Sequence, residues 1–329
     1  MTARPPARDP GAPGENGALE VSIQGGAIGD RVYQGAITFF ALCVPLLLLA
    51  IAWEIVSAAW PALRQFGFSF LATRIWDPVN QVYGVAPAIY GTLVTSAIAL
   101  LIATPLALGV AIFLSEFAPR WLRQPVAFLV DLLAAIPSVV YGLWGIVVLL
   151  PLLRQYVAPF LVDTLGLGRL PIFAGTFYPG NILAAGLILA IMVLPYISAV
   201  SREILLAVPR SQREAALALG ATKWEMIWGA VLPFAKSGIL GGVILGLGRA
   251  LGETMAVTMV IGNRPEIPTS LFQPGYTLAS QIANQFLEAT GELQISALMA
   301  AGFVLFAITL VVNALARWLV WQVGREARV

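Results

Sequence analysis

Histidine is absent from this chain of 329 residues, and cysteine occurs once. Without histidine there are no zinc motifs and no imidazole for acid–base chemistry. The single Cys43 lies in an apolar run, which excludes a disulfide framework and a thiolate metal site. Charged residues are also scarce, at 11% of the chain, whereas hydrophobic residues make up 59% and the mean hydropathy is +0.86. These values exclude a soluble domain and predict a polytopic membrane protein.

A nucleotide-binding P-loop is missing as well. That motif requires glycine directly before lysine, and the two lysines of the chain, Lys223 and Lys236, follow threonine and alanine. Candidate nucleophiles, bases and metal ligands do not gather at any one depth of the membrane. We therefore predict that the chain is not an enzyme and binds no cofactor. If ATP drives its function, the ATP and its Mg²⁺ are bound by a separate subunit.

Long apolar runs dominate what is present, and they predict an all-α protein with six transmembrane helices. Each run is long enough to cross about 30 Å of hydrocarbon at roughly 1.5 Å per residue. Residues 1–30 are rich in proline, glycine and alanine, and we expect them to form a disordered cytoplasmic tail before the transmembrane domain of residues 31–329. The predicted spans are residues 34–60, 87–114, 125–153, 181–200, 237–261 and 297–320.

The basic residues are distributed unevenly about these spans. Thirteen fall on the side of the two termini and five on the opposite side. We therefore predict that both termini and the loop over residues 202–236 are cytoplasmic. The thirteen are Arg4, Arg8, Arg31, Arg120, Arg123, Arg202, Arg210, Arg213, Lys223, Lys236, Arg317, Arg325 and Arg328, and the five are Arg64, Arg74, Arg154, Arg169 and Arg264.

The loop over residues 202–236 is a polar segment between two apolar runs. Residues 211–218 favour a helix, and Gly220 can leave it through a left-handed conformation at little cost. A second short amphipathic piece follows over residues 222–228. We predict two short helices that meet at a glycine turn. We interpret this loop as a docking surface for another protein. An ordinary surface helical hairpin is the alternative.

This loop resembles the cytoplasmic loop of ABC importer permeases. The family pattern is Glu-Ala-Ala, three residues, Gly, nine residues, Ile, one residue, Leu-Pro, and Ala230 stands here in place of the isoleucine. The resemblance implies a coupling helix that inserts into a groove of a separate ATPase subunit. The residues that match the pattern are Glu214, Ala215, Ala216, Gly220, Leu232 and Pro233.

The fifth predicted span carries a charge among glycines. Gly238, Gly242 and Gly246 recur every four residues, so a neighbouring helix can approach this face closely. Arg249 falls about 20° from Gly242 on a helical projection and therefore faces the packed side. Because a charge at the bilayer centre costs about 2.5–3.5 kcal/mol, we expect Arg249 and its neighbour Glu253 on or beside the substrate path. A purely structural ion pair is the alternative.

The second predicted span places Thr92, Thr95 and Ser96 on one helical face. Small hydroxyl residues at this spacing let helices pack closely and form hydrogen bonds with each other. They are candidates for lining a polar path, and helix packing is the alternative reading. In the third predicted span, Pro137 and Gly142 favour a kink or local unwinding.

Four longer runs, residues 76–78, 90–96, 136–142 and 248–257, resemble the permease subunits of bacterial phosphate ABC importers, and the similarity extends from about residue 31 to the end. The resemblance implies phosphate import across the bacterial inner membrane, with Arg249 and Glu253 taking part in translocation. It also implies a homologous permease, an ATPase dimer and a periplasmic phosphate-binding protein as partners, with lipid around the spans and no nucleic acid. The alternatives are an importer of another oxyanion, such as sulfate or molybdate, an ion-coupled secondary transporter, or a membrane enzyme.

Overall fold

The computed structural model describes residues 26–326 of the protein, and residues 1–25 and 327–329 lie outside the described part. The chain divides into two compact units, residues 1–53 and 54–329. In the first unit, the described residues all belong to helix α1 (Gly26–Phe66), whose last residues are part of the second unit.

The described part of the first unit is an apolar helical segment. Its large side chains, such as Leu46 and Leu49, are exposed along the helix. A helix that is apolar all round requires lipid or another apolar helix as its neighbour. The predicted disordered tail over residues 1–30 lies outside the described residues, except for residues 26–30, which the structure places in α1.

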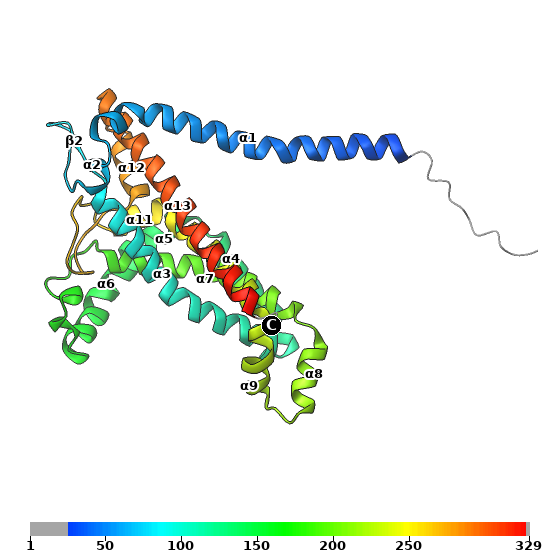
Figure 1. Ribbon diagram of the computed structural model, residues 1–329. Helices are drawn as coiled ribbons and strands as arrows, with labels where there is room; N and C mark the ends of the chain where they lie inside the picture. Colours follow the sequence, from blue (N-terminus) through cyan, green and yellow to red (C-terminus); the bar gives the residue numbers. More distant parts are fainter. Residues whose placement is uncertain (1–25, 327–329) are drawn as a thin grey trace, which may run out of the picture. The chain divides into compact units, whose positions relative to one another are not determined.

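The second unit is a bundle of helices with one small hairpin, which confirms the predicted all-α class (Figure 1). In the hairpin, β1 (Trp76–Asp77) and β2 (Val82–Tyr83) run antiparallel, with Trp76 opposite Tyr83. The α-helices after α1 are α2 (Ser69–Ala72), α3 (Ala86–Ile112), α4 (Arg120–Ala135), α5 (Ser138–Trp144), α6 (Leu150–Leu152), α7 (Ile182–Ala207), α8 (Arg210–Ala218), α9 (Lys223–Met226), α10 (Leu232–Gly252), α11 (Met255–Val260), α12 (Leu278–Phe286) and α13 (Glu292–Glu326).

Short π-helical and 3₁₀ segments join several of these helices. Four of them continue an α-helix and so lengthen it, and the other three lie in the connection between α6 and α7. They are η1 (Phe113–Phe117), η2 (Gly145–Leu149), η3 (Leu153–Val157), η4 (Phe160–Thr164), η5 (Leu167–Arg169), η6 (Pro171–Phe173) and η7 (Ile227–Val231).

Helix α7 is the centre of the second unit. It begins at Asn181, whose Oδ1 atom accepts a hydrogen bond from the Ala184 amide at 2.8 Å, as expected of an N-cap. It packs against α3 along a row of fully buried alanines and against α10 along the predicted glycine ridge. A Cβ atom on Gly246 would lie 2.7 Å from Ile197 and from Val193 of α7. Small residues therefore set the spacing of both helix pairs.

Six helical stretches of the described part are long and apolar enough to cross a membrane, which agrees with the predicted number. Four of the six overlap their predicted spans closely or extend them, and the third and fifth differ. The six stretches are Gly29–Phe66, Ala86–Phe117, Ser138–Thr164, Ile182–Ala207, Lys223–Gly252 and Glu292–Gln322.

The third span differs from its prediction over residues 125–153. The helix stops at Ala135, Ile136 is extended at φ −66° and ψ 129°, and a new helix begins at Ser138. Because Pro137 disfavours a helical conformation at the preceding residue, the expected kink is a complete break. Residues 120–135 form a separate amphipathic helix, and the apolar stretch that can span the membrane is Ser138–Thr164.

The fifth span also differs from its prediction over residues 237–261. It starts earlier, at α9, and continues through η7 into α10. It ends at Gly252, where Glu253 is extended at φ −71° and ψ 128°, and α11 forms a separate short helix. Residues 223–236, which the sequence assigned to the polar loop, are therefore the beginning of this helix.

Candidate functional site

Arg249 lies in the last turn of α10, beside the break in the helix and not at its centre. Its guanidinium group is 4.6 Å from the ring centroid of Tyr196, on α7, which is a cation–π distance. One of its terminal nitrogens, Nη2, is 4.0 Å from Oε2 of Glu253. The Arg249 side chain is 34% exposed, and within the described residues its buried Nε atom has no hydrogen-bond partner. The group therefore retains donors for a ligand.

Glu253 divides its carboxylate between two neighbours. Oε2 faces Arg249, and Oε1 accepts a 3.4 Å hydrogen bond from the amide of Ala256 in the first turn of α11. The side chain is only 8% exposed. Arg249 and Glu253 are neighbours, as expected. They do not lie on one continuous helix, because the backbone at Glu253 is extended. The pair is long, so it neutralises Arg249 only in part.

Two tyrosines connect this site to the break between α4 and α5. The Tyr196 hydroxyl donates to the Ala134 carbonyl at 3.2 Å, and the Tyr141 hydroxyl donates to the Leu133 carbonyl at 2.8 Å. Both carbonyls belong to the last turn of α4, and the residues four positions further on lie beyond that helix; the Leu133 carbonyl also accepts a 3.4 Å bond from the Ile136 amide. Sequence reasoning missed both tyrosines, although hydroxyl groups inside apolar helices are a signal that a partner is needed.

The breaks in two helices therefore lie close to one another. Helix α11 packs directly on α5, and a Cβ atom on Gly142 would lie 2.6 Å from the sulfur of Met259. Irregular backbone at membrane depth is tolerated only inside protein or beside a polar cavity. Discontinuous helices form the substrate sites of many membrane transport proteins.

Thr92, Thr95 and Ser96 are buried in another part of the bundle. Thr92 Oγ1 donates to the Ala88 carbonyl at 2.7 Å and accepts from the Leu278 amide at 3.0 Å, which ties α3 to the start of α12. Thr95 donates to the carbonyl of Gly91 in its own helix at 2.8 Å. Within the described residues these bonds do not reach Arg249, and the Ser96 hydroxyl has no hydrogen-bond partner. The contacts of Thr92 and Thr95 are those of helix packing.

The polar loop forms the predicted pair of helices at a glycine turn. Helix α8 ends at Ala218, and Gly220 has φ +87°. The Gly220 amide donates to the Leu217 carbonyl and the Ala221 amide donates to the Ala216 carbonyl, as in a Schellman motif. The next helix begins at Thr222 with a capping box to Glu225. The second helix is not short, because it continues into α10.

The residues of the family pattern occupy different parts of this loop. Glu214 and Ala215 are exposed on α8, and Ala216 is half-buried. Leu232 and Pro233 lie where η7 passes into α10. Two large apolar side chains near the turn, Leu217 and Leu219, are also exposed. This end of the molecule therefore presents apolar groups that a partner could cover.

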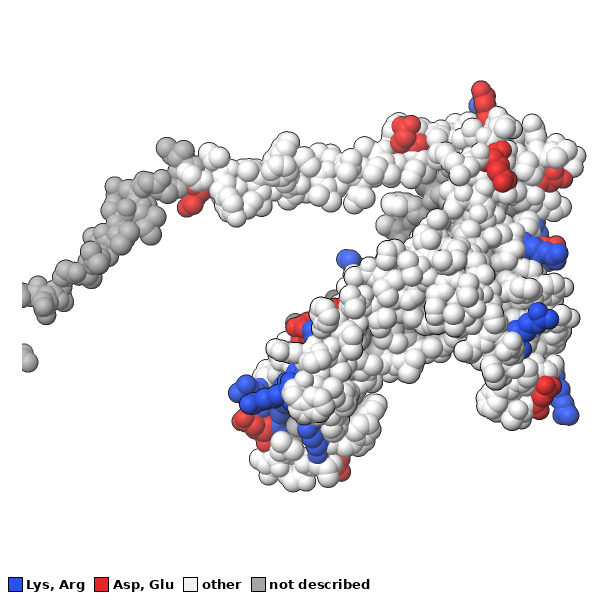
Figure 2. Space-filling view, turned by 180° about the vertical axis from the view of Figure 1, so that it is seen from behind, with Lys and Arg blue, Asp and Glu red and all other residues white. Residues whose placement is uncertain are grey.

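Charged side chains gather at the end of the second unit that carries α8 and α9, and the middle of the visible face is nearly free of them (Figure 2). The hairpin and α12 lie at the opposite end (Figure 1). An uncharged zone between two charged ends is what a bilayer requires. It places the α8–α9 pair outside the hydrocarbon.

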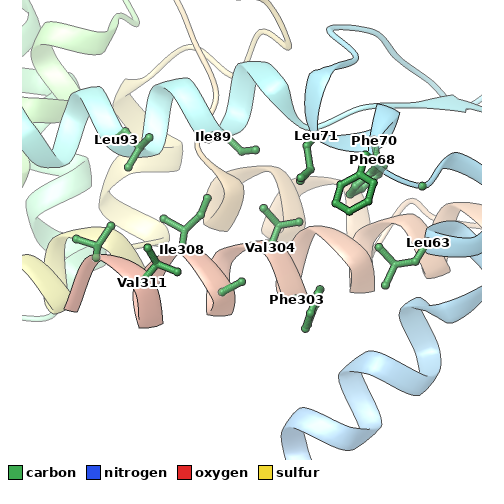
Figure 3. Close-up of a pocket in the computed structure, with 13 residues that line it drawn as sticks. Leu63, Phe68, Phe70, Leu71, Ile89, Leu93, Phe303, Val304, Ile308 and Val311 are labelled. Carbon is green, nitrogen blue, oxygen red and sulfur yellow. The ribbon is translucent and has the colours of Figure 1, made fainter. Parts of the chain in front are cut away.

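An apolar groove of about 640 Å³ lies between α3 and α13 (Figure 3). Ile89 and Leu93 of α3 face Val304, Ile308 and Val311 of α13 across it. Its lining residues are all apolar, so it offers no donor to an anion. The groove suits lipid tails or another helix and is not the candidate site for a charged substrate.

Comparison with known proteins identifies the class. Residues 103–325 match the family model described as "Binding-protein-dependent transport system inner membrane component", and the chain belongs to this family of permeases. The fold is similar to that of a crystal structure of a bacterial alginate ABC transporter in complex with an alginate-bound periplasmic protein, with a TM-score of 0.57 and 19% identity over 88% of this chain and 96% of that one.

Within the class, the chain is similar to one particular permease, the phosphate transport system permease protein PstC. It is 47% identical to PstC of Pasteurella multocida, over 90% of this chain and 93% of that protein. It is 44% identical to PstC of Mesorhizobium japonicum, over 94% of this chain and 96% of that protein. The similarity therefore extends over nearly the whole length of both relatives.

Proposed function

We propose that the chain is the transmembrane permease subunit of an ATP-driven importer that moves inorganic phosphate from the periplasm to the cytoplasm. Two observations support this proposal. The relatives named phosphate transport system permease match nearly the whole chain. The sequence also carries Arg249 and Glu253 within the run of residues 248–257 that resembles phosphate permeases.

The partly unsatisfied guanidinium group of Arg249 is the observation that carries the substrate class. Phosphate has one to two negative charges near neutral pH, and a guanidinium group offers a planar set of donors that matches its oxygens. Arg249 is one-third exposed and its ion pair with Glu253 is long, so an anion can approach it. Glu253 limits how tightly the anion is held, because a transport site must also release its substrate.

The proposal includes partners that supply energy and substrate. A homologous permease completes the path, and a dimer of ATPase subunits binds ATP and Mg²⁺. A periplasmic phosphate-binding protein delivers the anion. Both termini and the α8–α9 pair are cytoplasmic in this arrangement, as the uneven distribution of basic residues predicts. Helix α8, with Leu217 and Leu219 exposed beside its glycine turn, docks on the ATPase.

The test is transport by the complete complex in sealed proteoliposomes. Phosphate-loaded binding protein is placed outside the vesicles, and ATP is trapped inside, where the ATPase subunits lie. Uptake of labelled phosphate is measured with and without excess sulfate or molybdate. We expect uptake that requires ATP and resists both competing anions. Competition by sulfate or molybdate indicates another oxyanion. Uptake driven by a proton gradient without ATP indicates a secondary transporter and contradicts the proposal.

A further inference from the structure

Helix α8 is loosely packed against the bundle. Over the described residues 210–218, none of the side chains is fully buried. A small apolar cluster at this end of the bundle consists of residues from α3, α7 and the α9–α10 helix, and α8 adds only the half-buried Ala216 to it. The apolar contact between α8 and the rest of the bundle is therefore small.

Arg213 provides the main polar attachment of α8. Its Nε and Nη2 atoms donate to Oε1 of Glu116 at 3.2 and 2.8 Å. Its Nη2 atom also donates to the Leu205 carbonyl at 2.7 Å, and Nη1 donates to the Val208 carbonyl. One side chain therefore binds α8 to the π-helical end of α3 and to the last turn of α7.

The chemistry at this attachment favours arginine specifically. The guanidinium group directs donors toward a carboxylate and two carbonyls at once, and a lysine ammonium cannot reproduce this fork. The carbonyls belong to the C-terminal end of α7, where a cation is favoured by the helix dipole. The Glu116 side chain is 7% exposed and that of Arg213 is 19% exposed, so water screens the pair poorly.

The same two membrane helices lead to the candidate substrate site. Helix α7 carries Tyr196, whose ring lies against Arg249, and α3 packs along α7 over most of its length. Lys223, in the first turn of α9, lies 4.8 Å from the ring centroid of Phe117 in η1, which gives the end of α3 a second, weaker contact with the loop. A movement of α8 can therefore be passed to α3 and α7 only if the Arg213 contacts hold α8 firmly against them.

We infer that Arg213 is a positioning residue that couples the ATPase to the transmembrane path, by fixing α8 to Glu116 of α3 and to the last carbonyls of α7. This inference rests on the proposed function. Arg213 itself touches neither ATP nor the transported anion.

The experiment measures phosphate uptake and ATP hydrolysis in proteoliposomes, both normalised to the assembled complex recovered by size-exclusion chromatography. We compare Arg213→Gln, Arg213→Lys and Glu116→Gln with the matched control Arg120→Gln, which removes an exposed arginine at the start of α4. We expect uptake per ATP hydrolysed to fall at least tenfold in both Arg213 variants and several-fold in Glu116→Gln. Arg120→Gln should stay within twofold of wild type.

A merely structural role gives a different result. In that case the variants lower the amount of assembled complex, while each surviving complex retains the wild-type ratio of uptake to hydrolysis. If Arg213→Gln and Glu116→Gln keep the wild-type ratio of uptake to hydrolysis, the inference is overturned. It is also overturned if Arg213→Lys restores that ratio. If the wild-type complex itself shows no ATP-dependent phosphate uptake, the proposed function fails instead, so the two failures are distinguishable.

Discussion

The second unit contains two arginine–glutamate pairs of opposite construction. Arg213 and Glu116 are 2.8 Å apart, and carbonyls of α7 occupy further donors of the arginine. Arg249 and Glu253 are 4.0 Å apart, and the arginine lies against an aromatic ring with its Nε atom unpaired among the described residues. A saturated pair holds structure in place, whereas an unsaturated one can exchange its partner for a ligand. This difference supports the proposals that the first pair anchors α8 and that the second contacts the anion.

Removing the unsaturated arginine should have the largest effect. We expect Arg249→Gln to lower phosphate uptake at least a hundredfold in a complex that still assembles, and Arg249→Lys to recover little, because lysine lacks the fork of donors. The matched control is Arg154→Gln, which neutralises an exposed arginine in η3. Labelled phosphate uptake, normalised to assembled complex, provides the measurement.

The double variant Arg249→Leu with Glu253→Leu separates anion contact from simple neutralisation. A pair that only neutralises itself can be replaced by apolar residues with little loss, because both buried charges disappear together. We expect the double variant to assemble and to remain inactive. Recovered uptake would assign both residues a structural role and would remove the functional contrast between the two pairs.

The glycine turn next to the saturated pair should give the next largest effect. Gly220 has φ +87°, a conformation that β-branched residues resist at a cost of about 1–3 kcal/mol. Gly220→Val should therefore change the direction of the chain between α8 and α9. We expect uptake to fall about tenfold while the complex still inserts, because this glycine lies outside the spans.

Gly229→Val is the matched control for this substitution. Gly229 is an exposed glycine in η7, and a Cβ atom there would meet nothing within 4 Å. It should leave uptake within twofold of wild type. If both valine variants transport equally well, the turn geometry has no part in coupling.

Much of this arrangement could be predicted from sequence because it depends on local chemistry. Apolar run lengths predicted six spans, and the position of Gly220 predicted the turn. The arginine contacts could not be predicted in the same way. Arg213 and Glu116 are 97 residues apart, and Tyr196 and Ala134 are 62 residues apart. Periodicity along one helix carries no information about such partners.

The helix breaks were partly predictable. Pro137 indicated a disturbance in the third span, but its size depends on whether the freed carbonyls of α4 find other donors. Tyr141 and Tyr196 supply them from α5 and α7. The end of α10 at Gly252 had no comparable signal in the apolar pattern, because the residues that follow, such as Met255 and Val257, continue it. The break placed Arg249 at a helix end, where the sequence had predicted a helix centre.

The aromatic partner of Arg249 should give a smaller effect. Tyr196→Phe keeps the ring beside the guanidinium group but removes the hydrogen bond to the Ala134 carbonyl, which is typically worth about 0.5–1.5 kcal/mol. We expect uptake to fall two- to threefold, and Tyr196→Ala to fall further because the cation–π contact is also lost. Tyr156→Phe, at an exposed tyrosine, is the control. Equal uptake in Tyr196→Phe and Tyr196→Ala would show that the ring does not orient Arg249.

The smallest effect should come from Asp77, a carboxylate that forms no ion pair with an arginine within residues 26–326. Asp77, in the hairpin between α2 and α3, accepts hydrogen bonds from the side chain and amide of Asn80 and from the amide of Val79. These bonds, chiefly the one from the Asn80 side chain, hold the pKa of Asp77 below its ordinary value. Since the folded pKa is lowered, the ionised form stabilises the turn at neutral pH. That contribution is lost as the pH falls from the ordinary aspartate value through the folded one.

Hydrogen exchange at the amides of Val79 and Asn80 reports this turn directly. We expect their exchange, corrected for the intrinsic pH dependence, to accelerate as the pH falls below about 4, the ordinary aspartate value, and to be already faster at neutral pH in Asp77→Asn. Because Asp77 is only partly buried, solvent screens the interaction, and uptake at neutral pH should change by less than twofold in that variant. A large loss of uptake in Asp77→Asn would instead give the hairpin a part in transport, and would mean that the comparison between the two arginine pairs omits a third functional carboxylate.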